Sequence, residues 1–263
     1  MPLVIGLCCL VEFIIPLPAA DREPSLAPGG DHPLGTDPYG HDVLLLVSRA
    51  AIRSGGVAAW ATGVTTLLAI TIGVIAARRP LGMFDTLQTA IARVLDGLGP
   101  FVIAACVFTL IQRLDIWLAG AVLAAFVWPS LSGIVRGEAI MHSKSTYVEA
   151  LRAIGASPLR ITVFHLLPAM VDRLLPPCAA LIGAYIGLFG ALGFIGVGVT
   201  TELNLGFIVF DGMQVMHSQP WYFWSGVGAF VAVLGIVAMG AAITTHLLGG
   251  TPLIHSSVKL GEA

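Results

Sequence analysis

Five stretches of this chain contain no Asp, Glu, Lys or Arg: residues 54–77, 97–112, 116–135, 174–201 and 212–258. A helix needs about 20 mainly apolar residues to cross a bilayer, and lipid cannot satisfy the open edges of a sheet. Residues 2–17 form a sixth apolar stretch, interrupted by Glu12. The sequence therefore predicts an all-α integral membrane protein with six transmembrane helices, at about residues 1–20, 54–77, 92–112, 116–135, 174–200 and 222–248.

The composition agrees with a chain surrounded by lipid and argues against a soluble domain or a nucleic-acid-binding protein. Of the 263 residues, 57% are hydrophobic and only 11% are charged, whereas a soluble domain carries about 25% charged residues. A net charge of −2 argues against a nucleic-acid partner and leaves membrane lipid as the main surroundings. The four cysteines and seven histidines lack metal-ligand spacing, so we predict no metal site.

The positions of Lys and Arg predict how the chain is oriented. With the N-terminus inside, eight basic residues lie in cytoplasmic segments and four in external ones. Both termini are then cytoplasmic, as are the loop at 136–173 and the tail at 251–263, while residues 21–46 form an extracytoplasmic loop. Residues 17–20 also fit a signal-peptidase site, so the first span is either retained or cleaved, and the later spans keep their orientation in both cases.

One polar, helix-forming segment, at residues 147–168, stands between the fourth and fifth predicted spans. A Ser or Thr at position 143, 145 or 146 can cap a helix over 146–157, and Glu149 in its first turn suits the helix dipole. Gly155 is expected to end this helix, and Pro158 prevents its continuation. Such a helix in a membrane protein predicts contact with a soluble partner.

An apolar stripe on this helix, spaced three residues apart at Val148, Leu151 and Ile154, is expected to insert into a groove on that partner. The segment resembles the EAA loop of binding-protein-dependent ABC importers, whose short coupling helix docks on a cytoplasmic ATPase. Glu149 and the glycine six residues later match the family pattern, and the L-L-P at 166–168 closes it. The residues that the resemblance implies in ATPase coupling are Tyr147, Val148, Glu149, Ala150, Leu151, Ile154, Gly155, Ala156, Ser157, Pro158, Arg160 and Pro168.

Residues 32–44 indicate which group of ABC importer permeases the chain resembles. They read HPLGTDPYGHDVL and resemble the HPLGTDxxGRDVL signature of dipeptide/oligopeptide/nickel permeases, specifically the C-type subunit of their heterodimeric pair. His41 stands where that family usually has Arg. The resemblance runs from about residue 32 to residue 249. It implies a type I ABC importer transmembrane fold with a cytoplasmic coupling helix, and a permease domain at 47–250.

Three further expectations concern contacts. Arg93 and Asp96 match a family R-x-x-D, and their i, i+3 spacing predicts a structural ion pair. Six glycines between residues 183 and 198 predict close helix packing against a partner subunit. The extracytoplasmic loop is expected to contact a solute-binding protein through His32, Gly35, Thr36, Asp37, Gly40 and Asp42.

The source of energy must lie outside this chain, because its sequence contains no G-K-[ST] and therefore no P-loop for ATP. The resemblance implies one or two ATPase subunits that bind ATP and Mg²⁺, a homologous second permease and a solute-binding protein, all at a bacterial cytoplasmic membrane. It implies import of short peptides, or of nickel chelates or haem, by ATP-driven alternating access. A standalone secondary transporter or channel is the alternative, but no internal repeat supports it.

Overall fold

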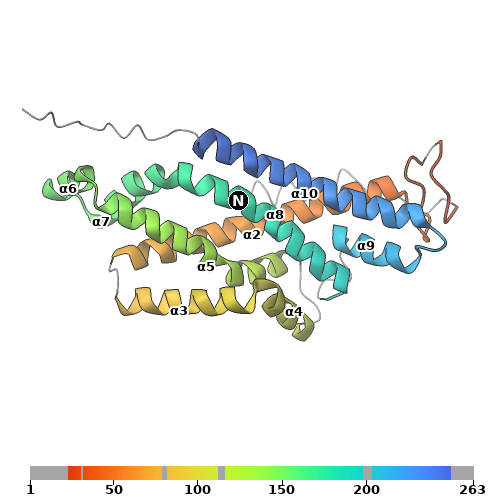
Figure 1. Cartoon of the computed structure of the whole chain (residues 1–263), viewed down its shortest axis with the longest axis horizontal. Helices are drawn as coiled ribbons and strands as arrows, with labels where there is room; N and C mark the ends of the chain where they lie inside the picture. Colours follow the sequence, from red (N-terminus) through yellow and green to blue (C-terminus); the bar gives the residue numbers. More distant parts are fainter. Residues whose placement is uncertain (1–22, 31, 79–81, 112–115, 198–202, 250–263) are drawn as a thin grey trace, which may run out of the picture.

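The computed structural model of this chain describes residues 23–30, 32–78, 82–111, 116–197 and 203–249. Its long helices lie along the long axis of the molecule (Figure 1). They are α2 (Val43–Arg78), α5 (Ile116–Ser143), α8 (Leu167–Ile195) and α10 (Pro220–Gly249). The shorter elements are α3 (Met83–Leu98), α4 (Pro100–Leu110), α6 (Thr146–Ala153), α7 (Pro158–Ile161), the π-helical turn η1 (Thr162–Leu166) and α9 (Leu205–Gln214).

The prediction of an all-α membrane protein is confirmed. Helices α2, α5, α10 and the continuous η1–α8 segment are each long and apolar enough to cross a bilayer. The α3–α4 pair makes a fifth span if the two helices are counted together. The predicted first span, at residues 1–20, lies outside the described residues.

The third predicted span is not one straight helix from residue 92. Helix α3 already begins at Met83, and it meets α4 at an angle of 81°. The bend falls at Gly99, whose φ is +75°, and at Pro100, which lacks the amide hydrogen needed to continue a helix. Counting charge-free residues missed α3 because Asp85, Arg93 and Asp96 interrupt the run. The structure buries the side chain of Asp85 against α5.

The other spans also run further than predicted. Helix α2 begins at residue 43 rather than 54, α5 continues to residue 143 rather than 135, and α8 begins at residue 167 rather than 174. A helix satisfies its own backbone hydrogen bonds, so it continues past charged side chains that point to protein or to water. The charged residues that the longer helices contain include Arg49, Arg53, Arg136, Glu138, Asp172 and Arg173.

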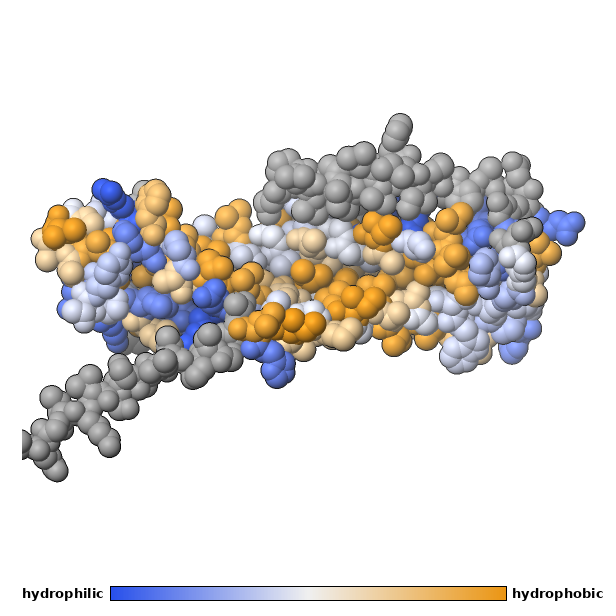
Figure 2. All heavy atoms as spheres, turned by 90° about the horizontal axis from the view of Figure 1, so that it is seen from above, coloured by the Kyte–Doolittle hydropathy of each residue, from blue (hydrophilic) through white to orange (hydrophobic). Residues whose placement is uncertain are grey.

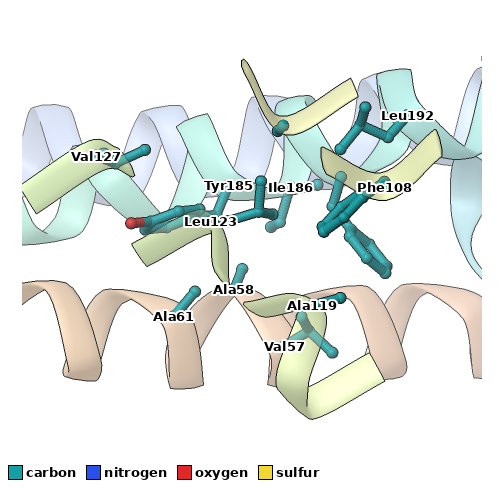
Figure 3. Close-up of a cluster of buried hydrophobic side chains, with 12 residues drawn as sticks. Val57, Ala58, Ala61, Phe108, Ala119, Leu123, Val127, Tyr185, Ile186 and Leu192 are labelled. Carbon is teal, nitrogen blue, oxygen red and sulfur yellow. The ribbon is translucent and has the colours of Figure 1, made fainter. Parts of the chain in front are cut away.

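A central apolar cluster holds four helices together (Figure 3). Ala58 and Ala61 of α2 lie against Leu123 of α5 and Tyr185 of α8, and Phe108 adds α4 to the same cluster. Each of these side chains is at most 2% exposed. Small residues on α2 allow the close approach of its neighbours that membrane helices use for packing.

Two further clusters lie toward the ends of the molecule. The cluster near α6 joins α2, α5 and α8 and includes Val135, Val148, Ile161, Leu166 and Met170. The cluster near the loop at 23–42 joins α2, α9 and α10 and includes Val43, Leu46, Leu205, Ile208 and Tyr222. The bundle is therefore packed along its whole length, from the loop end to the α6 end.

Two glycines of the glycine-rich stretch of α8, Gly190 and Gly193, pack within this chain, whereas Gly187 has open space beside it and packing of this stretch against a partner subunit stays a prediction. A Cβ atom added at Gly206 of α9 would overlap the backbone of Gly190, so α8 and α9 touch backbone to backbone. An added Cβ at Gly193 would lie 2.8 Å from the Nδ2 atom of Asn204. Glycine is required at these positions because α9 and its N-cap residue Asn204 lie so close to α8. The sequence did not predict α9.

The loop at 23–42, predicted to be extracytoplasmic, is ordered by its own polar side chains. The hydroxyl of Thr36 accepts a hydrogen bond from the amide of Leu26 at 2.8 Å and donates to the carbonyl of Glu23 at 3.1 Å. Asp37 accepts bonds from the amides of Tyr39 and His41 at 2.9 and 2.7 Å. The loop is tied to α10 because the indole nitrogen of Trp221 donates to the carbonyl of Thr36.

These contacts correct the expected role of several loop residues. Thr36, Asp37 and Asp42 are 0%, 3% and 6% exposed, so their side chains build the loop rather than its outer surface. Gly35 and Gly40 have φ values of +77° and +83°, which explains glycine there without a partner. Tyr39, at 67% exposure, is the most exposed large apolar side chain in the described part of the loop.

Asp42 joins the loop to the start of α2. One carboxylate oxygen accepts a hydrogen bond from the amide of Leu44, and the other lies 2.8 Å from Nδ1 of His32. Burial disfavours the charged carboxylate, but the hydrogen bonds from His32 and from the amides of Leu44 and Leu45 outweigh burial and lower the pKa of Asp42. The ionised form therefore stabilises the loop above the ordinary pKa of Asp, and this contribution is lost as pH falls through the lowered value.

We expect Asp42→Ala to cost about 1–2 kcal/mol of unfolding free energy at pH 7, because it removes a helix cap and a charge-assisted hydrogen bond. Thermal unfolding of the purified protein from pH 7 to pH 3 measures this. The difference between the native chain and the variant should shrink below about pH 4, where the carboxylate of Asp becomes protonated. A difference independent of pH would contradict the role of the ionised form.

Candidate functional site

Helix α6 lies at the end of the molecule opposite the loop at 23–42 (Figure 1). Ser145 is its N-cap residue, but the Ser145 hydroxyl donates to the carbonyl of His142 at 2.8 Å instead of capping the helix. The first turn is closed by the backbone, since the amides of Val148 and Glu149 donate to the carbonyl of Ser145. The predicted cap position is therefore confirmed, whereas side-chain capping is wrong.

Gly155 ends the helix, as the sequence predicted, although the last helical residue is Ala153 rather than residue 157. The φ of Gly155 is +81°, a left-handed conformation that other residues adopt at a cost. Its amide donates to the carbonyl of Arg152, and the amide of Ala156 donates to that of Leu151, both at 3.0 Å. This paired closure fixes where the chain leaves α6.

The apolar stripe of α6 is divided between two faces, which corrects the expectation that all of it docks on a partner. Val148 is 3% exposed and Leu151 is half-buried; both pack into the cluster at this end of the bundle. Ile154 is 79% exposed, and Tyr147 is 56% exposed. The helix therefore uses one face to rest on its own chain and presents the other outward.

The outward face is held by contacts with the segment that follows it. The hydroxyl of Tyr147 lies 2.9 Å from Nδ1 of His165 in η1, and the two rings meet edge to face with centroids 5.6 Å apart. Glu149 and Ala150 are exposed on the same short helix. The tyrosine is thus positioned by η1 while its ring remains accessible.

The remaining predicted coupling residues belong to the return path into the bundle. The hydroxyl of Ser157 accepts a hydrogen bond from the amide of Arg160 at 3.3 Å, and Pro158 is the first residue of α7. Arg160 is exposed, and Pro168 lies in the first turn of α8, where a missing amide hydrogen is tolerated. The structure places all of these residues close along the chain, and only some of them face outward.

Arg93 and Asp96 are exposed, and they form no ion pair with each other in the part of the chain that the structure describes. Asp96 instead accepts a hydrogen bond from the hydroxyl of Ser130 in α5 at 3.2 Å. The ion pair that ties α3 to α5 is formed by Asp85 and Arg136, which meet through two parallel hydrogen bonds. Sequence spacing could not reveal it, because the partners lie 51 residues apart.

Other polar contacts between helices were also absent from the sequence predictions. The amide nitrogen of Gln88 in α3 donates to the hydroxyl of Ser132 in α5 at 2.9 Å. Glu138 of α5 lies 3.7 Å from His142 and 4.0 Å from Arg173 of α8. Together with the ion pair of Asp85 and Arg136, these contacts fix α3 and α8 against the half of α5 that leads to α6.

A bundle of long apolar helices with one short, sharply terminated helix at its end defines a multi-pass membrane protein. Residues 69–247 match the family described as binding-protein-dependent transport system inner membrane component. The chain belongs to this family and is a permease subunit of an ABC importer of the cytoplasmic membrane.

Curated relatives agree with this membership. The chain is 28% identical over 227 residues to the nickel transport system permease protein NikC of Escherichia coli, covering 84% of this chain and 80% of the relative. It is 27% identical over 209 residues to the oligopeptide transport system permease protein OppC of Mycobacterium tuberculosis, with coverages of 79% and 72%. It is 26% identical over 201 residues to the dipeptide transport system permease protein DppC of Bacillus subtilis, with coverages of 76% and 62%.

The fold also resembles a solved transporter. An inward-facing structure of the MetNI methionine ABC transporter aligns with a TM-score of 0.61 at 16% identity, covering 78% of this chain and 97% of that chain. At this identity the likeness shows the fold alone, and it confirms the type I importer transmembrane fold that the sequence predicted.

Proposed function

We propose that this chain is the permease subunit through which separate ATPase subunits drive uptake of short peptides, with nickel complexes as the second cargo class. The observation that carries the proposal is the outward face of α6. It exposes the side chains of Tyr147, Glu149 and Ile154 at the end of a packed bundle, on a helix whose other face is anchored in that bundle. Relatives named for oligopeptide, dipeptide and nickel transport support these cargo classes.

The assembly that we propose has four kinds of subunit. A homologous second permease completes the translocation path, and one or two ATPase subunits bind ATP and Mg²⁺ and push on α6. The α6 end and both termini then face the cytoplasm, and a solute-binding protein approaches the loop end. ATP-driven closure of the ATPases would move α6 and rock the packed helices between two arrangements, because a packed bundle shifts between discrete states.

We expect Ile154→Asp to weaken association with the ATPase roughly 10-fold or more, because a central apolar side chain at an interface is replaced by a charge. The fold should be preserved, since Ile154 is 79% exposed in this chain. Co-purification of the ATPase with the permease pair, and the rate of ATP hydrolysis by the complex, are the two measurements.

Met83→Asp is the matched control. Met83 is 90% exposed, is the first residue of α3 and lies outside the α6 segment. The control should retain both association and ATP hydrolysis. If Ile154→Asp reaches the membrane and still binds and stimulates the ATPase as the native chain does, α6 is not the docking element and the proposed function fails.

A further inference from the structure

A cavity of about 550 Å³ lies behind α6, between the ends of α2 and α5 and the α7–η1 segment. Its floor is apolar and belongs to the cluster at this end of the bundle, with Val74, Ala139, Val148, Ile161 and Leu166 among its lining residues. Its volume falls in the range of about 300–1,000 Å³ that holds small organic ligands. None of the family-pattern residues on the outward face of α6 lines it.

Three basic side chains line the same cavity: Arg78 at the last residue of α2, Lys144 just after α5, and Arg152 in the last turn of α6. All three are exposed, and within the described part of the chain none of them takes part in an ion pair. No carboxylate is among the residues that line the cavity. Its electrostatic character is therefore cationic, and it favours an anion over a neutral or positive ligand.

The position of the cavity selects the kind of anion. Two candidate spans, Val43–Arg78 and Trp117–Ser143, both end at this cavity. The helices that contain these spans have 36 and 28 residues, and at about 1.5 Å per residue both are long enough to reach the headgroup layer of a bilayer that is about 40–45 Å thick with its headgroups. Hydrophilic residues gather toward the ends of the molecule, and hydrophobic residues occupy much of the surface between them (Figure 2). The cationic side chains thus stand where the headgroups of the adjoining leaflet lie.

We propose that this cavity binds a phosphate-bearing amphiphile, an anionic phospholipid of the leaflet on the α6 side, with its phosphate among Arg78, Lys144 and Arg152. A bare phosphate ion would satisfy the charges but leave the apolar floor uncovered, whereas a phospholipid covers both. Basic pockets between spanning helices are a known means of binding anionic headgroups. Calling this leaflet cytoplasmic rests on the proposed function; the binding itself does not.

The occupant would touch the inner side of the docking helix. Val148 and Arg152 are four residues apart on α6 and both line the cavity, so a bound lipid contacts the face opposite the exposed Ile154. A lipid bound in the cavity would therefore support α6 from its inner side. This support would come from the permease chain and its lipid, and it would not require ATP.

The test measures lipid binding to the purified permease complex by native mass spectrometry, with phosphatidylglycerol titrated against phosphatidylcholine. Arg78→Gln and Lys144→Gln, singly and together, are expected to weaken phosphatidylglycerol binding roughly fivefold for each charge removed. Arg93→Gln is the matched control, because Arg93 is an exposed arginine of α3 that does not line the cavity and lies outside the α6 segment. It should bind the lipid as the native chain does.

Two competitor arms separate the sources of phosphate. Inorganic phosphate and glycerol phosphate, added at millimolar concentration, should leave the lipid bound. Displacement by either of them at that concentration would assign the cavity to a soluble phosphate compound and overturn the lipid proposal. Equal lipid binding by the native chain and the Arg78→Gln/Lys144→Gln variant would also overturn it. Because no ATP hydrolysis is measured, a failure of α6 docking leaves this result interpretable.

Discussion

Replacing Asp85 by alanine is expected to lower the free energy of unfolding by about 3–5 kcal/mol, because it leaves the buried end of the Arg136 side chain without its counter-charge. Asp85 is 3% exposed, and its two carboxylate oxygens accept bonds from Nε and Nη2 of Arg136, the second at 2.6 Å. The side chain of Arg136 is 28% exposed, so water cannot replace the lost contact fully. Thermal and denaturant unfolding of the purified complex measure the loss.

A double substitution provides the control for this prediction. In Asp85→Leu/Arg136→Leu both charges are removed, and an apolar pair of this kind is often neutral in its effect on stability. The double variant should therefore recover most of what Asp85→Ala loses. If the double variant is as unstable as the single one, the cost lies in the packing of α3 on α5 and not in an uncompensated charge.

Gly206→Ala is expected to cost about 3 kcal/mol, at the upper end of the usual cost of overpacking. The added methyl group would overlap the backbone of Gly190, and a backbone cannot rotate away as a side chain can. Helices α8 and α9 must then separate, which also disturbs the contact of Asn204 with Gly193. A lowered unfolding temperature and a lower yield of folded protein in membranes are the measurable results.

Gly137→Ala is the control. It makes the same substitution, but we expect it to leave the free energy of unfolding unchanged or to raise it. A Cβ atom added at Gly137 in α5 meets nothing within 4 Å. Alanine is favoured over glycine in a helix by about 1 kcal/mol, so this variant should be as stable as the native chain or more stable. Equal losses at Gly206 and Gly137 would show that the close approach of α8 and α9 does not limit stability.

The division of α6 into two faces changes how its sequence pattern is understood. An apolar stripe with three-residue spacing suggested insertion into a partner, yet Val148 and Leu151 face the bundle and only Ile154 stays outside. A docking helix needs both properties, because it must be accessible to the partner and firmly attached to the helices that it moves. In the function that we propose, the inner residues of α6 would transmit motion to the bundle, and the outer ones would receive it from the ATPase.

Local features of the chain determined the class of protein, most of the spans and the place where α6 ends. Charge-free runs of sufficient length predict spanning helices, and Gly155 predicts a helix end because only glycine adopts its φ of +81° without cost. The tertiary structure decided the rest: the partner of Asp85, the burial of Thr36 and Asp37, and the inward face of α6. These depend on how each helix is rotated and shifted against its neighbours, and that arrangement is set by packing between residues far apart in the sequence.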